Sequence, residues 1–468
     1  MYEATRESIS THQAPDWFHD AKLGIFVHWG LYSVPGWAPQ NGTPHDVVAR
    51  EGWNAWFARN PYAEWYGNSI RIPDSPSAAY HAAHYSADFT YEQFAPQFDA
   101  ASKAWDPGEW AALFATAGAR YAVLTTKHHD GFLLWPSIHP NPHQRGYQAT
   151  RDLVGEVTAA VRAQGLRMGL YYSAGLDWTF NARPIVEGAD LVRAIPQQAE
   201  YVSYATTHLR ELIDRYAPSV LWNDIGYPHA ANLYELFAYY YNRVPDGVIN
   251  DRFGQPRPDG TTAVPSDPLA VLGTAPTPHL DFRTPEYTTY STIAAEKWES
   301  TRGLGHSFGY NRNEAPEHML STAGLIHLFV DIVSKNGNLL LNVGPTATGL
   351  IPTEQRRRLL ALGEWLGTNG AAIYRTRPWV RAEGRTSDGI PVRFTQHDGV
   401  LYAILLGTPP HRDVAIQGLT AEPGTTIRLL GQEALATWLH WNDHLAITLP
   451  ESLSDAPAHV LRIAPQPR

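Results

Sequence analysis

The 468-residue sequence contains no cysteine. Disulfide bonds, thiolate nucleophiles, iron–sulfur clusters and zinc sites built from cysteine are therefore excluded. Neither a Gly-x-Gly-x-x-Gly motif nor a P-loop follows any predicted strand, which disfavours binding of a dinucleotide or of ATP. We therefore expect a protein without a cofactor, in which carboxylates are the available reagents.

Long apolar segments and an excess of positive charge are also missing. No stretch reaches the length of a membrane span, and the first 22 residues lack the apolar core of a signal peptide. The net charge of -10 argues against nucleic acid as the main partner. We expect a cytoplasmic protein that binds neither membranes nor nucleic acid. The sequence leaves open whether it forms a homo-oligomer.

Aromatic residues, in contrast, are abundant. They make up 12% of the chain, which includes 16 Trp and 24 Tyr. Most aromatic side chains pack in a protein core. Trp and Tyr also present flat apolar faces with a polar edge, a surface that matches the apolar C–H face and hydroxyl rim of a sugar ring. The composition is thus a hint of carbohydrate binding.

Strand-like and helix-like segments alternate from residue 20 to about residue 370. Such alternation predicts right-handed βαβ units and a parallel sheet. The number of units favours a (β/α)8-like barrel over a doubly wound sheet. The expected strands are 23–29, one that starts at 121, 166–173, 220–223, 247–250 and 338–343, and the expected helices are 106–118, 152–163, 197–216, 231–244, 322–333 and 353–368.

The sequence changes in character after residue 375. Short alternating runs follow, separated by turn signals such as Asp398-Gly399 and Pro423-Gly424, a pattern typical of an antiparallel β-sandwich. We therefore expect a barrel over residues 1–375 and a β-sandwich over 376–468, with a linker at 375–379. Pro and Gly concentrate around 253–279, where we expect a long loop open to proteolysis.

The segment Tyr121–Trp135 is the most informative part of the chain. It begins as a buried strand and ends in Lys127-His128-His129-Asp130-Gly131. Polar groups at the carboxyl end of a barrel strand indicate a site, because the loops there form the active face. The alternative is that the histidines only satisfy each other in a turn. Adjacent histidines on a strand point to opposite sides, which argues against a shared metal ion.

Other predicted strands and the connections between them carry similar residues. These are His28, Glu64-Trp65, Tyr171, Asn223-Asp224, Asp251-Arg252 and Glu286. Each has a plain structural explanation: Asp224 could cap a helix, Arg252 could pair with Asp251, and Glu286 could be a solvated loop charge. Together they indicate one face lined by aromatic, basic and acidic side chains. Two carboxylates among aromatics and histidines are the arrangement used for glycoside hydrolysis.

The chain resembles the retaining α-L-fucosidases of glycoside hydrolase family 29 over about residues 15–375. The motifs that carry the resemblance are KLGIFVHWGLYSVPGW (22–37), EWY (64–66), TTKHHDGF (125–132), GLYYS (169–173), LWNDIGYP (221–228), NDR (250–252), DFRTPEY (281–287), WESTRGLGHSFGYNRNE (298–314) and GNLLLNVGP (337–345). A barrel fold, hydrolysis of fucosylated oligosaccharides or glycoconjugates, and an accessory C-terminal sandwich are what this resemblance implies.

The resemblance also implies roles for single residues. Asp224 matches the nucleophile and Glu286 the acid/base, with Glu299 and then Glu314 as rivals because the acid/base lies on a variable loop. The residues that match fucose-binding positions are His28, Glu64, Trp65, His128, His129, Tyr171, Arg252 and Phe308. No metal site is implied. Trp65, Tyr171 and Phe308 would face the apolar side of the sugar, including its C5 methyl group.

Two other functions compete with the fucosidase hypothesis. A metal-dependent barrel hydrolase would use His28, His128 and His129, although Val27 and Trp29 leave the first strand without a His-x-His pair. A non-catalytic sugar-binding protein would lack one of the two carboxylates, and both are present. The sequence does not specify which fucosyl linkage is cleaved or whether fucose is transferred to other sugars.

Overall fold

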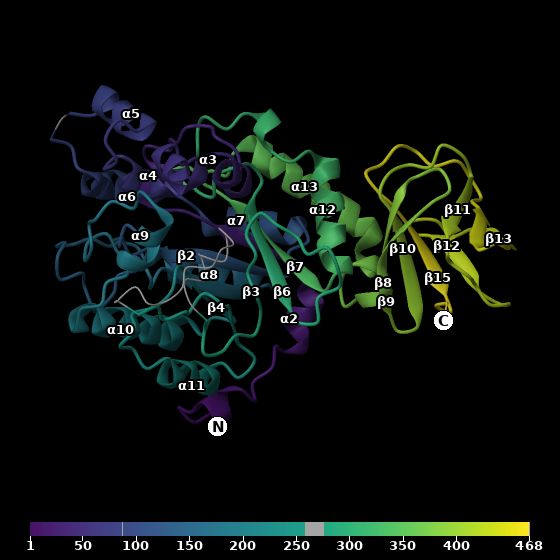
Figure 1. The fold of residues 1–468 in the computed structure, drawn as a ribbon, viewed down its shortest axis with the longest axis horizontal. Coiled ribbons are helices and arrows are strands. Elements are labelled where there is room, and N and C mark those ends of the chain that lie inside the picture. Colours follow the sequence, from purple (N-terminus) through teal and green to yellow (C-terminus); the bar gives the residue numbers. More distant parts are fainter. Residues whose placement is uncertain (87, 258–275, 468) are drawn as a thin grey trace.

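The structure, a computed structural model, describes residues 1–86, 88–257 and 276–467. A parallel sheet surrounded by helices forms the larger part of the molecule, and an antiparallel sheet forms the end that carries the C-terminus (Figure 1). Residues 258–275 of the expected protease-sensitive loop lie outside the described residues. None of the helices in the described part of the chain has the length and apolar character to cross a bilayer.

The parallel sheet has the strand order β5-β4-β3-β2-β1-β7-β6. At its centre, Ile25 of β1 pairs with Ala122 of β2 and with Leu341 of β7. All residues of β1, β2, β4, β5 and β7 are buried, as expected where both faces of a sheet are covered. The strands are β1 (Leu23–Val27), β2 (Tyr121–Lys127), β3 (Arg167–Tyr172), β4 (Val220–Asn223), β5 (Val248–Ile249), β6 (Trp298–Gly303) and β7 (Gly337–Val343).

Residues 281–287, which we call the closing segment, join the two edges of this sheet. Parallel bridges connect Asn250 with Phe282 on one side, and Arg283 with Trp298 and Glu286 with Thr301 on the other. The segment thus takes the eighth position of the ring, between β5 and β6. This arrangement confirms the (β/α)8-like barrel.

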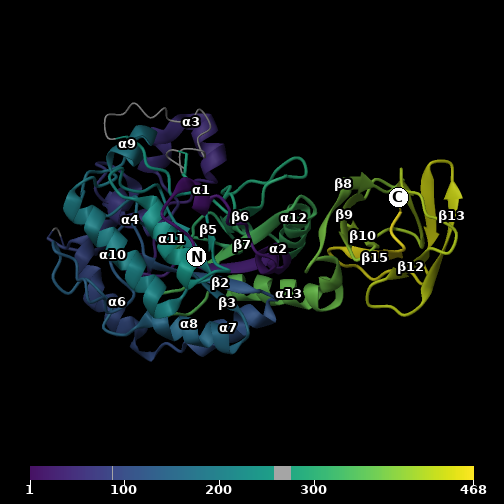
Figure 2. The same ribbon diagram turned by 90° about the horizontal axis from the view of Figure 1, so that it is seen from below.

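Helices surround the barrel strands (Figure 2). The expected helix 106–118 corresponds to α7, which Asp106 caps by accepting a hydrogen bond from the Gly108 amide at 2.8 Å, with Pro107 in the first turn. The helices are α1 (Arg6–Ile9), α2 (Asp16–Ala21), α3 (Pro44–Ala58), α4 (Tyr66–Ser69), α5 (Pro76–His84), α6 (Ala95–Ala101), α7 (Pro107–Thr116), α8 (Leu153–Ala163), α9 (Gly188–Arg193), α10 (Ala199–Tyr216), α11 (Leu233–Arg243), α12 (Thr322–Ser334) and α13 (Thr353–Asn369).

The C-terminal strands form one antiparallel sheet in the order β11-β14-β13-β12-β15-β10-β9-β8. It folds over on itself, because Thr386 at one edge bridges to Ile416 at the other, around a separate apolar core. This confirms the sandwich. The strands are β8 (Arg377–Arg385), β9 (Pro391–His397), β10 (Val400–Leu405), β11 (Asp413–Gln417), β12 (Thr426–Leu429), β13 (Leu435–Trp441), β14 (His444–Thr448) and β15 (His459–Ala464).

The expected linker at 375–379 is wrong in one respect, because β8 already begins at Arg377. The sandwich packs against α12 and α13 (Figure 1), and Tyr402, Ile404 and Val460 belong to the same apolar core as those helices. Arg393 also pairs with Asp331 of α12 at 2.6 Å. Tight packing of this kind explains why no free linker is needed. The division at residue 375 stays a prediction.

Candidate active site

A single cavity gathers all ten residues that the sequence predicts for the site. One lies in strand β3, two lie in the short 3-10 helix Ala63–Trp65, one lies on the closing segment, and the other six lie in the connections that follow β1, β2, β4, β5 and β6. The predicted residues that line the cavity are His28, Glu64, Trp65, His128, His129, Tyr171, Asp224, Arg252, Glu286 and Phe308. The sequence-based expectation of one face built from many segments therefore matches the geometry.

Asp224 lies directly after β4, where the chain turns sharply through Ile225 (φ 52°) and Gly226 (φ 83°). Its Oδ2 accepts a hydrogen bond from the Tyr171 hydroxyl at 2.8 Å. Its Oδ1 accepts from Nη1 of Arg252 at 2.8 Å and from its neighbour's amide at 3.0 Å. A carboxylate with this set of donors, one of them a guanidinium, has a fixed position.

Glu286 lies at the other side of Arg252, on the closing segment. Its Oε1 accepts from the Tyr62 hydroxyl at 2.7 Å, and its Oε2 accepts from Nη2 of Arg252 at 3.0 Å. Burial raises the pKa of Glu286, while Arg252 and the Tyr62 hydroxyl act in the lowering direction. The net pKa is above that of an ordinary glutamate. Glu286 is thus suited to carry and release a proton.

Arg252 joins the two carboxylates through adjacent nitrogens of one guanidinium group. The group is fixed further: Nε donates to the Thr284 hydroxyl at 3.0 Å, and Nη2 also donates to the Thr284 carbonyl at 3.2 Å. It lies over the Trp222 ring, with its central carbon 4.8 Å from the ring centroid. The planar fork therefore sets the relative position of Asp224 and Glu286.

Three neighbouring histidines line the cavity: the ring centroid of His128 lies 5.7 Å from that of His28 and 3.9 Å from that of His129. Nδ1 of His28 contacts Asn342 Oδ1 at 2.7 Å, and Nδ1 of His129 contacts Ser173 Oγ at 2.7 Å. Burial lowers the pKa of His28 to about 3 and moves the pKa values of His128 and His129 well below the usual range. A neutral imidazole has one donor and one acceptor nitrogen. Because Nδ1 is engaged in His28 and His129, each of these rings leaves its Nε2 for a sugar hydroxyl.

The expectation that His128 and His129 point to opposite sides is wrong. Both line the cavity, and their ring centroids lie 3.9 Å apart. Strand alternation does not apply to them because β2 ends at Lys127. Nε2 of His129 approaches Asp224 Oδ2 at 3.9 Å, whereas Nδ1 of His128 has no hydrogen-bond partner among the described residues.

Glu64 and three aromatic rings complete the predicted set. Glu64 Oε2 accepts from the Gly309 amide at 2.7 Å, and burial raises the pKa of Glu64 to about 8. The ring of Trp65 lies 5.1 Å from that of His129, and the ring of Phe308 lies 5.0 Å from that of His28. Histidine rings and apolar aromatic rings are thus neighbours in the lining of one cavity.

A family model described as Alpha-L-fucosidase matches residues 1–371 of the chain. The chain belongs to the α-L-fucosidase family. It is 33% identical to rat tissue α-L-fucosidase over 460 residues, which are 95% of this chain and 87% of the rat protein. The structure of Thermotoga maritima α-fucosidase with a mechanism-based inhibitor is 44% identical, with a TM-score of 0.87 over 99% of this chain and 100% of that one.

A second structure of the Thermotoga maritima α-fucosidase, in complex with fucose, matches 99% of this chain and 100% of that chain, with 44% identity and a TM-score of 0.86. The protein is therefore a glycoside hydrolase, an α-L-fucosidase that acts on fucosyl linkages. The barrel and sandwich described above agree with these structures.

The two rival glutamates of this α-L-fucosidase have structural partners and do not line the cavity. Glu299 is fully buried in β6, where it binds the Tyr121 hydroxyl and, at 3.2 Å, the Trp222 indole. Glu314 accepts from the amides of His306 and Ser307 at 2.6 and 2.8 Å. These contacts favour Glu286 as the second carboxylate of the site.

One serine deserves comparison with serine hydrolases, because residues 305–309 read Gly-His-Ser-Phe-Gly. Ser307 does not lie on a strand-to-helix elbow. Its hydroxyl donates to the Gly309 carbonyl at 2.7 Å and accepts from the Ala63 amide at 2.9 Å. Ser307 therefore holds the loop beside Glu64.

Sequence reasoning missed several residues of the α-L-fucosidase site. Tyr62 binds Glu286, yet it lies two residues before a motif that was recognised. Trp222 lies beneath Arg252, and Asn342 orients His28. Helix α3 was not predicted at all, although Trp53, Trp56 and Phe57 of this helix line the cavity. Its Pro44 start after Thr43 was the available signal.

Within residues 1–86, 88–257 and 276–467, one group of histidine and carboxylate side chains is close enough to share a metal ion. It consists of His12, His279 and Asp281, none of which lines the cavity. His28, His128 and His129 form no such group among these residues.

Proposed function

We propose that this α-L-fucosidase is an exo-acting, retaining enzyme that releases terminal α-L-fucose from oligosaccharides or glycoconjugates by double displacement. Asp224 is the nucleophile and Glu286 is the acid/base. The observation that carries the proposal is the single guanidinium of Arg252, which binds both carboxylates. Asp224 and Glu286 are only 8% and 6% exposed, so a glycan reaches them with its terminal sugar first.

In the first step, a carboxylate oxygen of Asp224 forms a bond to the anomeric carbon as the bond to the leaving oxygen breaks. Glu286 gives its proton to that oxygen. The product is a fucosyl ester on Asp224. Arg252 and the Tyr171 hydroxyl hold Asp224 in position for attack, while burial raises the pKa of Glu286 and so favours its protonated form.

In the second step, Glu286 takes a proton from a water molecule, whose oxygen attacks the anomeric carbon. The ester bond breaks, Asp224 leaves as a carboxylate and Glu286 is protonated again. Two inversions give overall retention of configuration. In retaining glycosidases the two carboxyl groups are typically about 5–5.5 Å apart, and we expect this separation between Asp224 and Glu286.

Recognition of fucose follows from the remaining residues of the cavity. The neutral rings of His28, His128 and His129 offer donors and acceptors to the sugar hydroxyls. Phe308 and Trp65 offer apolar faces to the C5 methyl group and the ring. The complex of the Thermotoga maritima α-fucosidase with fucose supports this choice of sugar.

Replacement of the nucleophile tests the proposal. We expect Asp224→Ala to lose at least about 10³-fold in kcat on aryl and natural fucosides alike, because the bond-forming group is gone. Azide should restore activity and give the fucosyl azide of inverted configuration, identified by NMR. Asp246→Ala, a surface change, is the control. An Asp224→Ala variant that retains a tenth of the parent activity overturns the assignment.

The metal-dependent alternative has its own test. The proposed mechanism routes no step through a metal ion, so kcat should be unchanged after exhaustive chelation and dialysis. Loss of kcat on chelation, followed by recovery with added zinc, supports the metal-dependent hydrolase instead.

A further inference from the structure

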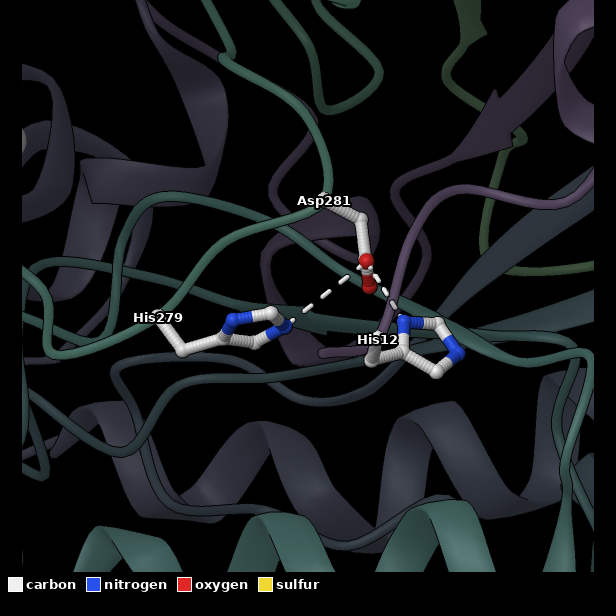
Figure 3. Close-up of side chains that lie close together, drawn as sticks. All are labelled: His12, His279 and Asp281. Carbon is white, nitrogen blue, oxygen red and sulfur yellow. Dashed lines mark hydrogen bonds and ion pairs between the residues drawn. The ribbon is translucent and has the colours of Figure 1, made fainter. Parts of the chain in front are cut away.

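His12, His279 and Asp281 meet at the amino-terminal side of the barrel, away from the cavity. Figure 3 shows both histidine rings directed at the carboxylate of Asp281. His12 belongs to the segment between α1 and α2, whereas Asp281 is the first residue of the closing segment. The carboxyl end of α11 lies beside them, where Tyr241 contacts Asp281. Three distant parts of the chain therefore converge on one point.

The donor atoms have the chemistry and spacing of a metal site. Nδ1 of His12 and Nε2 of His279 lie 2.7 and 3.7 Å from Oδ1 of Asp281. All three atoms lie within 4.8 Å of one another. Two ligands of a tetrahedral zinc ion are about 3.3 Å apart, given bonds of about 2.0–2.1 Å. Small side-chain rotations would therefore equalise the three separations.

The groups around the three side chains hold them in this orientation. Oδ2 of Asp281 accepts from the Ile249 amide at 2.7 Å and from the Tyr241 hydroxyl at 2.8 Å, which leaves Oδ1 for the histidines. The His12 ring stacks on the Tyr241 ring, with centroids 3.8 Å apart and planes 15° apart. Metal ligands in proteins are typically fixed by such outer contacts.

The burial of the three side chains also suits a ligand set. Nδ1 of His12 contacts Oδ1 of Asp281 at 2.7 Å, and Nε2 of His279 contacts the Tyr241 hydroxyl at 2.8 Å. The side chain of Asp281 is fully buried, and those of His12 and His279 are 3% and 8% exposed. The cluster thus presents a carboxylate oxygen and two imidazoles in a desolvated site.

We propose that His12, His279 and Asp281 bind one divalent transition-metal ion of the zinc class, which fastens the amino-terminal segment to the closing segment. Two imidazoles with one carboxylate favour such ions, whereas calcium and magnesium prefer all-oxygen sites. The ion is structural. It stabilises the segment that carries Glu286 five residues further on, and it takes no part in cleavage of the glycosidic bond.

Zinc binding by the untagged full-length enzyme tests the proposal. After chelation and dialysis, titration with zinc chloride in a calorimeter should show one tight site per chain. Addition of zinc at one hundred times Kd should raise the thermal midpoint by about 2–3 °C. Cobalt(II) should give the visible absorption of a low-symmetry site. The kcat on an aryl fucoside should stay constant throughout. A failure to bind zinc would therefore overturn the metal site and leave the proposed mechanism of fucoside cleavage untouched.

Variants locate the site. His279→Gln should weaken zinc binding at least 100-fold, whereas the exposed His411→Gln should not change it. Tyr241→Phe keeps all three ligands and removes the hydroxyl that contacts both Oδ2 of Asp281 and Nε2 of His279, so a loss of about 10- to 100-fold is expected. If His279→Gln fails to fold, Tyr241→Phe and His12→Gln decide the question. Absence of stoichiometric zinc binding, or equal affinity in His279→Gln and the parent, overturns the proposal in favour of a hydrogen-bonded cluster.

Discussion

Asp281 and Glu286 lie five residues apart on the closing segment and are equally buried, yet their pKa values move in opposite directions. The pKa of Asp281 is lowered to about 2, and that of Glu286 is raised. Asp281 accepts hydrogen bonds from His12, Tyr241 and the Ile249 amide. Glu286 accepts from Tyr62 and from Arg252, which also serves Asp224.

The difference shows that burial alone does not set the charge of these carboxylates. The amino end of the closing segment surrounds its carboxylate with donors, so the charge is permanent and holds segments together. At the carboxyl end, Glu286 accepts from fewer donors and shares the guanidinium of Arg252 with Asp224. Glu286 can therefore exchange a proton. One short segment thus carries a carboxylate that stabilises the fold, Asp281, and a carboxylate suited to proton transfer, Glu286.

Replacement of Glu286, at the carboxyl end of the closing segment, should have the largest effect on activity. We expect Glu286→Ala to lose about 10²- to 10⁴-fold in kcat/KM on natural fucosides, which need protonation of the leaving oxygen. Activated aryl fucosides should lose far less, and azide should give a product of retained configuration. Steady-state kinetics on both substrate classes measure this contrast.

The control for that experiment is stability. Glu286→Ala should unfold within about 1 kcal/mol of the parent in urea, since the change trims a cavity-lining group. If Glu286→Ala cleaves natural oligosaccharides nearly as well as the parent, the acid/base lies elsewhere, and Glu299→Gln is the next variant to measure.

Replacement at the amino end should change stability and leave the chemistry intact. In the parent, Asp281 has a folded pKa of about 2 against an unfolded value of about 3.9. It therefore contributes about 2–3 kcal/mol above pH 4, and this contribution is lost as the pH falls from about 4 toward 2. Urea unfolding of the parent and Asp281→Asn at pH 6 should differ by about this amount.

The same pair of proteins should converge in stability as the pH approaches 2, and their kcat at pH 6 should agree within about twofold, because no contact of Asp281 reaches the cavity. A constant stability difference from pH 6 to pH 3 contradicts the assigned pKa. If Asp281→Asn loses as much kcat as Glu286→Ala, Asp281 and Glu286 do not divide into a stabilising and a catalytic carboxylate.

The sequence predicted those parts of the fold that local patterns control. Strand β4 matches its predicted bounds, and helix α7 begins at Pro107, one residue after the predicted start at 106. The closing segment escaped prediction because isolated bridges, rather than a continuous ladder, hold it between β5 and β6. No periodicity over so few residues could have indicated it.

The site shows the same division. The ten predicted residues all line the cavity, because motifs at strand ends identify them one by one. Partners that depend on long-range contacts were not predictable: Tyr62 lies 224 residues from Glu286 in the chain, and His12 lies 269 residues from Asp281. The directions of the pKa shifts depend on these long-range partners and therefore required the structure.

The smallest expected effect concerns Tyr62, whose hydroxyl stabilises the charged form of Glu286 and so lowers its pKa. Tyr62→Phe removes that bond, and the pKa of Glu286 should rise further. Because the acid is active when protonated, the alkaline limb of kcat/KM should move to higher pH by about 0.5–1 unit, the equivalent of one hydrogen bond. The matched control is Tyr287→Phe, whose hydroxyl donates to the Gly305 carbonyl instead. Full pH profiles on an aryl fucoside measure both variants. If the alkaline limb moves to lower pH in Tyr62→Phe, or moves equally in Tyr287→Phe, the proton-donating group is not Glu286. The comparison of Glu286 with Asp281 would then no longer contrast a catalytic carboxylate with a stabilising one.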